Sequence, residues 1–271
     1  MNKLSLAFSP CPNDTFIFDP IVNHRIDLEG MKFDYTLHDV ETLNNMAIRG
    51  TTHMLKVSFF TYVMLRKKLV LLDSGSALGF GNGPILISKI GCRLSDIPDL
   101  KVAIPGEHTT AHLLFSIAAP QPAQKIFMHF GQIEDAILGG TVDAGVIIHE
   151  NRFTYQKRGL YPIMDLGAFY ENLTKQPIPL GGIVVKKSVG YDTINKLNRI
   201  LFRSVDFAMN NPEIPMDFVR EHAREMDPEV MKQHINLYVN ANTLSLGTGG
   251  HVAILKMIEV AREHKLIPMV E

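Results

Sequence analysis

Histidine and hydroxyl side chains follow several apolar segments of this 271-residue chain. The clearest case is His149, which comes directly after the apolar run 144–148. An imidazole titrates near neutral pH and accepts a proton without a large shift of its pKa. A positioned base of this kind typically accelerates a reaction ~10²–10⁴-fold. Position alone leaves two interpretations of His149 open, a catalytic base and a structural histidine.

Two further turns carry groups that suit an anion. Lys56, Val57 and Ser58 end one apolar segment, and Thr109 and Thr110 stand where a strand is expected to meet a helix. Backbone N–H groups at the start of a helix, together with hydroxyls, bind carboxylates and phosphates. Each turn also has a purely structural interpretation. The threonines can cap the helix, and Lys56 can be a solvated lysine on a strand edge.

A third turn, at residues 9–15, follows the apolar segment 3–8 and precedes an expected helix. This turn and the residues that follow His149 are expected to shape the cleft. The candidates are Ser9, Asn13, Asp14, Glu150 and Arg152. For Glu150 and Arg152 a structural alternative stays open, because an acidic residue also favours the start of a helix and an arginine is commonly a surface residue.

The histidines and cysteines form no recognisable metal motif. His108 and His112 stand four apart on an expected helix, but the chain has no HExxH motif to supply the usual context. Cys11 and Cys92 lack metal-ligand spacing, and two reduced thiols fit a reducing compartment. Cys11 is interpreted as a small, half-buried residue, because no basic neighbour that would lower its pKa is evident. The other histidines, His234 among them, are expected at the surface or in packing roles, and no metal is expected.

The charge balance argues against two classes of partner. The 27 lysines and arginines nearly balance the 28 aspartates and glutamates, and no long basic run occurs. Nucleic-acid and anionic-membrane partners leave a basic footprint, so neither is expected. The apolar segment 3–8 is too short for the core of a signal peptide, and no apolar run has transmembrane length. We therefore expect a cytoplasmic protein.

Alternating strand and helix signals predict an α/β fold. The predicted strands are 3–8, 31–39, 53–58, 69–75, 85–89, 101–105, 125–130, 142–148 and 183–187. Helices are predicted from residue 12, over 40–49 with Gly50 as its end, over 59–67, after 109, and over 132–138, 194–208, 212–225, 228–238 and 252–264. The glycine-rich stretch 75–84 is interpreted as a flexible connection, because no Lys-Ser/Thr pair follows it and a strand comes next.

The order of these elements predicts two lobes. Residues 1–87 and 182–271 form lobe I from both chain ends, and residues 88–181 form an inserted lobe II. Two connections then cross between the lobes, which suits a ligand enclosed between them. In open α/β folds, ligands bind beyond the carboxyl ends of strands, so the turns described above are expected to converge on one cleft.

Several motifs in order also resemble a known family. They are SPCPNDTFIF, DVETLN, the KVS turn, PGEHTTA and IIHENRFTY, and they extend over almost the whole chain. Together they resemble the 1,4-dihydroxy-6-naphthoate synthase family of the futalosine pathway of menaquinone biosynthesis. The resemblance implies the periplasmic-binding-protein type II fold, with two α/β lobes around an interlobe cleft.

The resemblance also implies an activity. It is that of a carbon–carbon lyase without a cofactor, which converts cyclic dehypoxanthinylfutalosine to 1,4-dihydroxy-6-naphthoate. By position, the family's proton acceptor falls on His149, and its substrate-contacting turns fall on Lys56-Val57-Ser58 and Thr109-Thr110. The expected partner is therefore a small-molecule substrate that carries a carboxylate.

Two other functions are compatible with the same fold. A solute-binding protein of a transporter is one, but such a protein is exported, and no signal peptide is expected here. The chorismate dehydratase of the same pathway is the other, and the SPCPND and IIHE motifs argue against it. An imidazole at the expected cleft favours the lyase over the binding protein.

Overall fold

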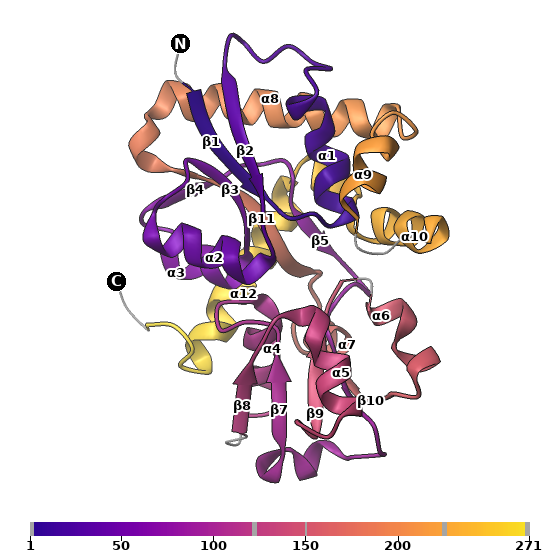
Figure 1. Cartoon of the computed structure of the whole chain (residues 1–271). Coiled ribbons are helices and arrows are strands. Elements are labelled where there is room, and N and C mark those ends of the chain that lie inside the picture. The colour runs from indigo at the N-terminus through magenta and orange to yellow at the C-terminus, as the bar shows by residue number, and fades with distance from the viewer. Residues whose placement is uncertain (1–2, 121–123, 150, 224–226, 269–271) are drawn as a thin grey trace.

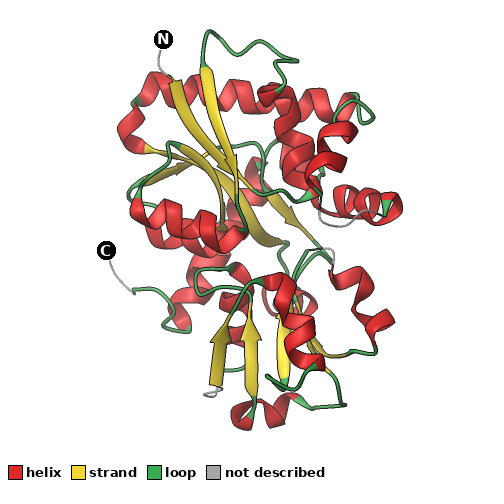
Figure 2. Cartoon of the chain, viewed as in Figure 1, coloured by secondary structure: helices red, strands yellow, loops and turns green. Residues whose placement is uncertain are grey.

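The computed structural model describes residues 3–120, 124–149, 151–223 and 227–268. It contains two β-sheets, each flanked by helices, which form an upper and a lower α/β lobe in Figure 1. The first sheet has the order β2-β1-β3-β11-β4, with β5 pairing β11, and the second has the order β10-β6-β9-β7-β8. Figure 2 shows the helices packed around both sheets.

The strands of the first sheet come from both halves of the chain. They are β1 (Lys3–Phe8), β2 (Lys32–Leu37), β3 (Met54–Ser58), β4 (Leu69–Leu71), β5 (Ala77–Gly79) and β11 (Ile178–Lys186). The second sheet contains β6 (Ile85–Ser88), β7 (Lys101–Ile104), β8 (Gln124–Phe127), β9 (Ala144–Ile147) and β10 (Tyr161–Asp165). β1 runs parallel to β2 and β3, and β7 runs parallel to β8 and β9. The carboxyl ends of these parallel strands supply the turns that border the site.

The helices divide between the two sheets. Those of the first lobe are α1 (Pro12–Val22), α2 (Val40–Arg49), α3 (Phe59–Leu65), α8 (Tyr191–Asn210), α9 (Met216–His222), α10 (Pro228–Tyr238), α11 (Ala241–Leu244) and α12 (Gly247–Glu263). Those of the second lobe are α4 (Thr110–Ala118), α5 (Ile133–Leu138), α6 (Asn151–Thr154) and α7 (Leu166–Thr174). In the described part of the chain, no helix combines the length and apolar character needed to cross a membrane.

Local sequence signals account for both ends of α2. α2 begins after Asp39, whose side chain accepts hydrogen bonds from the backbone N–H groups of Glu41 and Thr42. It ends at Gly50, which adopts a φ of 65° in the left-handed region. Glycine enters that region without a Cβ penalty, which explains why the helix ends there. Both ends lie where the sequence predicted them.

The chain passes between the sheets in two places, between β5 and β6 and between β10 and β11. The two passages touch at Gly83 and Gly167. A Cβ atom on Gly83 would lie 2.3 Å from the Cα atom of Gly167, so the backbones meet with no space for a side chain. The contact continues the pairing of β10 with β6, since Gly167 follows β10 and Gly83 precedes β6.

Several elements differ from the sequence prediction. The stretch 75–84 is not wholly a flexible connection, because β5 lies within it and pairs with β11. β10 and α7 were not predicted, since β10 is a largely exposed strand that contains Pro162 and has no clear alternation. α12 begins at Gly247, five residues before the predicted start, although glycine is a poor helix former.

Candidate active site

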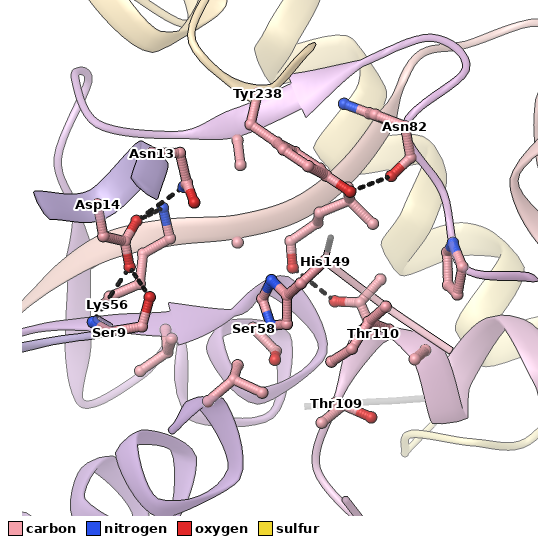
Figure 3. Close-up of a pocket in the computed structure, with 18 of the residues that line it drawn as sticks. Ser9, Asn13, Asp14, Lys56, Ser58, Asn82, Thr109, Thr110, His149 and Tyr238 are labelled. Atoms are coloured by element: carbon pink, nitrogen blue, oxygen red, sulfur yellow. Dashed lines mark hydrogen bonds and ion pairs between the residues drawn. The ribbon is translucent and has the colours of Figure 1, made fainter. Parts of the chain in front are cut away.

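A cavity lies between the two lobes and collects the predicted turns (Figure 3). Its empty volume is about 700 Å³, a figure that includes the open solvent at its mouth. Its polar lining residues are Ser9, Asn13, Asp14, Lys56, Ser58, Asn82, Thr109, Thr110, His149 and Tyr238. Val57 also lines it. The strand-end turns of β1, β3, β7 and β9 thus meet at one place.

One of the proposed site residues that the structure describes, Arg152, is not among those that line the cavity. Arg152 on α6 donates a hydrogen bond from Nη1 to the carbonyl oxygen of Gly83 at 2.8 Å, so it contacts the connecting segment and does not line the cavity. Glu150 lies outside the described residues.

His149 follows β9 after one intervening residue and has a φ of 56°. A left-handed backbone is uncommon for residues other than glycine, although histidine, asparagine and aspartate adopt it more readily than most. Such a conformation sharply changes the chain direction after the strand, and Figure 3 shows the imidazole among the groups that line the cavity. Strained backbone positions of this kind are common at functional sites.

Cys11 is the polar neighbour of His149 on the lobe I side. Its Sγ atom lies 3.6 Å from Nδ1 of His149, and the thiol is 7% exposed. The ring of Phe130 contacts the same imidazole edge-to-face at a centroid distance of 5.0 Å. The expectation that Cys11 has no basic neighbour is therefore wrong. The contact joins residues from different lobes, so no local sequence signal shows it.

His234 on α10 lies behind His149. The two rings are stacked with centroids 6.2 Å apart, and Nε2 of His234 lies 2.9 Å from Oδ1 of Asn13. Because an amide oxygen only accepts, Nε2 carries the hydrogen. Complete burial, with added repulsion from His149 and Lys56, holds the pKa of His234 well below its usual range. His234 is therefore a buried, neutral imidazole next to the cavity. Of the two roles expected for it, the one at the surface is excluded.

Lys56 forms a buried ion pair with Asp14. Its Nζ atom lies 2.9 Å from Oδ1 of Asp14 and 3.2 Å from the carbonyl oxygen of Gly75. Oδ2 of Asp14 also accepts hydrogen bonds from the backbone N–H of Ser9 at 3.2 Å and from its hydroxyl at 2.7 Å. β3 lies inside the sheet, so the alternative of a solvated lysine on a strand edge is wrong. Because Asp14 balances its charge, Lys56 is not an isolated cation.

The hydroxyl groups of Thr109 and Thr110 both donate their hydrogens to backbone carbonyl oxygens of the protein. Oγ1 of Thr109 donates to the carbonyl oxygen of Gly106 at 2.9 Å and caps α4 by accepting from the N–H of His112 at 3.2 Å. Oγ1 of Thr110 donates to the carbonyl oxygen of Leu180 at 2.9 Å. A ligand can therefore accept hydrogen bonds from the backbone at the start of α4, where the first N–H groups have no intrahelical acceptor. The two threonine hydroxyls have no hydrogen left to donate.

Ser58 differs from the threonines. Its Oγ atom accepts a hydrogen bond from Nδ2 of Asn44 at 3.1 Å, and its backbone N–H donates to Oδ1 of the same amide at 2.9 Å. No described residue accepts the hydroxyl hydrogen of Ser58, which lines the cavity. This O–H group and the start of α4 together form a site that suits a carboxylate.

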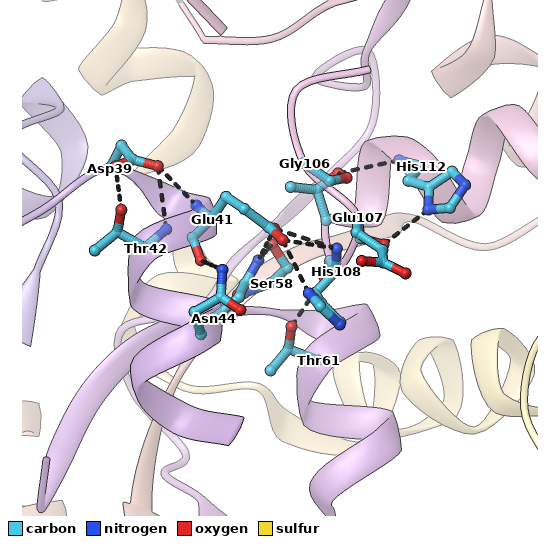
Figure 4. A network of polar contacts seen from close by, with 12 residues as sticks. Asp39, Glu41, Thr42, Asn44, Ser58, Thr61, Gly106, Glu107, His108 and His112 are labelled. Atoms are coloured by element: carbon cyan, nitrogen blue, oxygen red, sulfur yellow. Dashed lines mark hydrogen bonds and ion pairs between the residues drawn. The ribbon is translucent and has the colours of Figure 1, made fainter. Parts of the chain in front are cut away.

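A polar network beside Ser58 connects the lobes (Figure 4). The carboxylate of Glu41 on α2 accepts from the backbone N–H of His108 at 3.2 Å and lies 2.9 Å from Nδ1 of its ring. Nδ2 of Asn44 lies 3.2 Å from Oε2 of Glu41, and Thr61 donates to the carbonyl oxygen of His108 at 2.9 Å. Glu41 therefore connects lobe I to the loop that precedes α4.

His108 and His112 have other partners and do not converge on a common ligand. His112 Nδ1 lies 2.7 Å from the carbonyl oxygen of Glu107, and its Nε2 lies 3.0 Å from Nζ of Lys125. Within the described ranges, no group of three or more histidine, cysteine or acidic side chains is arranged to hold a metal ion.

Similarity to known proteins places the chain in a family. A family model described as Menaquinone biosynthesis matches residues 4–263. The chain belongs to this family. Among its relatives, a 1,4-dihydroxy-6-naphthoate synthase from Thermus thermophilus is 40% identical over 266 residues, which are 98% of this chain and 96% of that protein. The protein of the same name from Streptomyces coelicolor is 40% identical over 272 residues, covering 98% and 95%.

Solved structures show the same fold. A protein from Archaeoglobus fulgidus matches with a TM-score of 0.91 at 29% identity and covers 98% of both chains. The alkanesulfonate-binding protein of Xanthomonas axonopodis pv. citri, bound to MOPS, matches with a TM-score of 0.73 at 13% identity over 98% of this chain and 94% of that one. The periplasmic aliphatic sulphonate-binding protein of Escherichia coli has a TM-score of 0.66 at 12% identity, over 99% and 89%. The expected periplasmic-binding-protein fold of this menaquinone-biosynthesis family member is confirmed.

Sequence reasoning missed several residues of the site. Glu41 and Asn44 lie in the DVETLN motif that contributed to the resemblance, but no role was assigned to them. Asn82 lies within the glycine-rich stretch that was interpreted as a flexible connection, and Tyr238 ends a helix 156 residues further on. Tyr238 donates a hydrogen bond to the carbonyl oxygen of Asn82 at 3.3 Å, a contact between distant segments that periodicity does not reveal.

Proposed function

We propose that this protein is a 1,4-dihydroxy-6-naphthoate synthase, a carbon–carbon lyase that converts cyclic dehypoxanthinylfutalosine, with His149 as the proton acceptor. The family and the two relatives of that name support the reaction. The observation that carries the assignment of the base is the position of His149 in the interlobe cavity, together with the start of α4. A binding protein needs no such base.

The substrate carboxylate binds at the start of α4. The backbone N–H groups there and the hydroxyl of Ser58 donate hydrogen bonds to it, and the helix dipole favours its negative charge. The Thr109 cap and the Thr110 bond to Leu180 hold this end of the helix in position. The carboxylate thereby fixes the substrate relative to His149, and such positioning is one way in which binding contributes to the rate.

His149 then removes a proton and starts a retro-aldol-like opening of the substrate. The electron pair left behind forms a new double bond as the carbon–carbon bond to the sugar-derived part breaks, and the electron pair of that broken bond passes into the conjugated ring system of the other part. Aromatisation to the naphthalene product provides the driving force. For Nε2 to be the acceptor, Nδ1 has to carry a hydrogen and donate it to Cys11, whose Sγ atom lies 3.6 Å away.

The surroundings of His149 favour this proton transfer. The ring of His234, which stacks on that of His149, stays neutral. It therefore does not repel the positive charge that forms on His149 when it accepts a proton. The Glu41–His108 contact holds the lobes together beside the carboxylate site. A closed cavity excludes water from the reactive intermediate.

We further propose a carboxylate-bearing small-molecule partner, no nucleic-acid or membrane partner, no cofactor and a cytoplasmic location. The proposed lobes are residues 1–87 with 182–271 and residues 88–181, with bounds that fall within β6 and β11. The near-balanced charge supports the second of these statements, that neither a nucleic acid nor a membrane is a partner. Ser9, Asn13 and Asp14 shape the cavity through the Asp14–Lys56 pair.

The assignment is tested by incubating the purified protein with cyclic dehypoxanthinylfutalosine, without added metal or nucleotide, and measuring 1,4-dihydroxy-6-naphthoate by mass spectrometry. We expect product. Tight binding of the substrate without product would indicate a binding protein on the same fold. Conversion of chorismate in place of this substrate would indicate the dehydratase of the pathway.

A further inference from the structure

The side chain of Asn82 is a polar group in the cavity for which the described protein supplies no partner. Asn82 lies on the segment between β5 and β6, lines the cavity and is 1% exposed. Neither its Nδ2 nor its Oδ1 atom has a hydrogen-bond partner among the described residues. A buried amide without partners is costly, and groups of this kind in native proteins usually have a reason.

The backbone of Asn82 is held in place from two sides. The hydroxyl of Tyr238 on α10 donates to its carbonyl oxygen at 3.3 Å. The next carbonyl, that of Gly83, accepts a hydrogen bond from Nη1 of Arg152 at 2.8 Å. The amide itself packs against Gly79, where an added Cβ would lie 3.0 Å from Nδ2. Asn82 is therefore positioned before any ligand binds.

We propose that the Asn82 carboxamide binds a hydroxyl group of the substrate and so makes the enzyme specific for a ligand with a sugar-derived, hydroxylated part. A carboxamide presents one donor group and one acceptor side by side, and a hydroxyl is also both donor and acceptor. A carboxylate would satisfy only Nδ2 and would repel Oδ1. The inference rests on the proposed function, because that substrate has both a carboxylate and a sugar-derived part.

The arrangement of the cavity agrees with a ligand that has a carboxylate at one end and a hydroxylated, sugar-derived part at the other. In the view of Figure 3, His149 lies between Asn82 and Tyr238 on one side and Ser58 and Thr109 on the other. A substrate with its carboxylate at Ser58 and the start of α4 would direct its opposite end towards Asn82. The bond that breaks, which joins the two parts of the substrate, would then lie near His149.

The test compares the affinities of two ligands. The substrate carries the sugar-derived hydroxyls, and the product, 1,4-dihydroxy-6-naphthoate, keeps the carboxylate and lacks that part. Dissociation constants are measured by calorimetry for H149N and for H149N combined with Asn82→Leu or Asn82→Asp, because the slow turnover expected of H149N leaves most of the substrate intact during the titration. Leucine keeps the shape and removes both polar atoms, whereas aspartate removes the donor.

We expect both Asn82 substitutions to weaken substrate binding by roughly 10–100-fold, and N82L, which adds no charge, to change product binding less than about twofold. The melting temperature of N82L should equal or exceed that of its parent, because an unsatisfied buried amide is gone. Equal weakening of both ligands, or a large fall in melting temperature, would show that Asn82 has only a structural role and would overturn the proposal.

The result also separates this proposal from the function on which it rests. If the wild-type protein binds and converts the substrate but the Asn82 substitutions leave its affinity unchanged, only the role of Asn82 is wrong. If the wild-type protein neither binds nor converts the substrate, the proposed function and the role of Asn82 both fall.

Discussion

Sγ of Cys11 lies 3.6 Å from Nδ1 of His149, so a residue of the other lobe, 138 positions away in the chain, contacts the imidazole that lines the cavity. The neighbour of a histidine ring nitrogen decides which tautomer the ring adopts. Because Cys11 precedes α1 and His149 follows β9, the contact exists only when the lobes face each other as they do here. The lobe arrangement and the state of the imidazole are thereby linked.

Replacing Cys11 tests whether this contact positions His149. We predict that Cys11→Ala lowers kcat about five- to tenfold, since a hydrogen bond contributes ~1 kcal/mol. Cys11→Ser should retain more activity, because a hydroxyl can also donate or accept. The measurement is kcat and its pH profile for both variants. An unchanged rate and profile in C11A would show that the thiol only fills space.

The Glu41–His108 contact is predicted to hold the lobes together. Glu41→Gln removes the charge that faces His108 and keeps the size of the side chain, so we expect a several-fold fall in kcat/KM with changes in both kcat and KM. Small-angle scattering should show a larger radius of gyration for E41Q. Glu107→Gln is the matched control, since it removes a carboxylate that is exposed on the loop that carries His108. Identical behaviour of the two variants would contradict the role of Glu41.

The contact between Gly83 and Gly167 is predicted to exclude any side chain. Gly83→Ala places a Cβ atom 2.3 Å from the Cα atom of Gly167, and overpacking of this kind typically costs ~1–3 kcal/mol. Urea denaturation should show that loss in the free energy of unfolding. The control is Gly91→Ala, where a Cβ would meet no atom within 4 Å. Equal stability of G83A and G91A would mean that the connecting segments separate freely.

The acid stability of the protein should depend partly on Glu29. Hydrogen bonds from Arg199 and Arg203 lower its pKa to about 2, so the carboxylate form is favoured in the folded state. A depressed pKa adds stability above the unfolded value of 4.5, and that stability is lost as the pH falls towards about 2. We predict that Glu29→Gln is less stable than the wild type at pH 7 and that the difference shrinks between pH 4.5 and 2. A difference that stays constant over this range would exclude the linkage.

Much of the framework followed from local patterns in the sequence. The strands of both sheets that border the cavity, the helix 40–49 and its end at Gly50 were predicted from periodicity and capping residues alone. These signals succeed because each depends on residues a few positions apart. The placement of polar turns at strand ends was sufficient to bring Ser58, Thr110 and His149 into one candidate site.

The partners of these residues could not be predicted in the same way. Lys56 pairs with Asp14 because β3 lies next to β1, and Asn13 meets His234 because α10 packs on α1. Both contacts depend on packing between segments that lie far apart in the chain. Asn82 was overlooked for a similar reason, since its position is fixed by Tyr238 and by the pairing of β5 with β11.

The central claim is that His149 is the proton acceptor of a 1,4-dihydroxy-6-naphthoate synthase. Asparagine tolerates the left-handed backbone at this position, so His149→Asn should fold normally. The decisive measurement is the rate of 1,4-dihydroxy-6-naphthoate formation from cyclic dehypoxanthinylfutalosine by the wild type and by H149N, with substrate affinity measured on the same samples. We predict that H149N binds the substrate but forms product at least ~100-fold more slowly. Turnover by H149N at the wild-type rate would contradict the account.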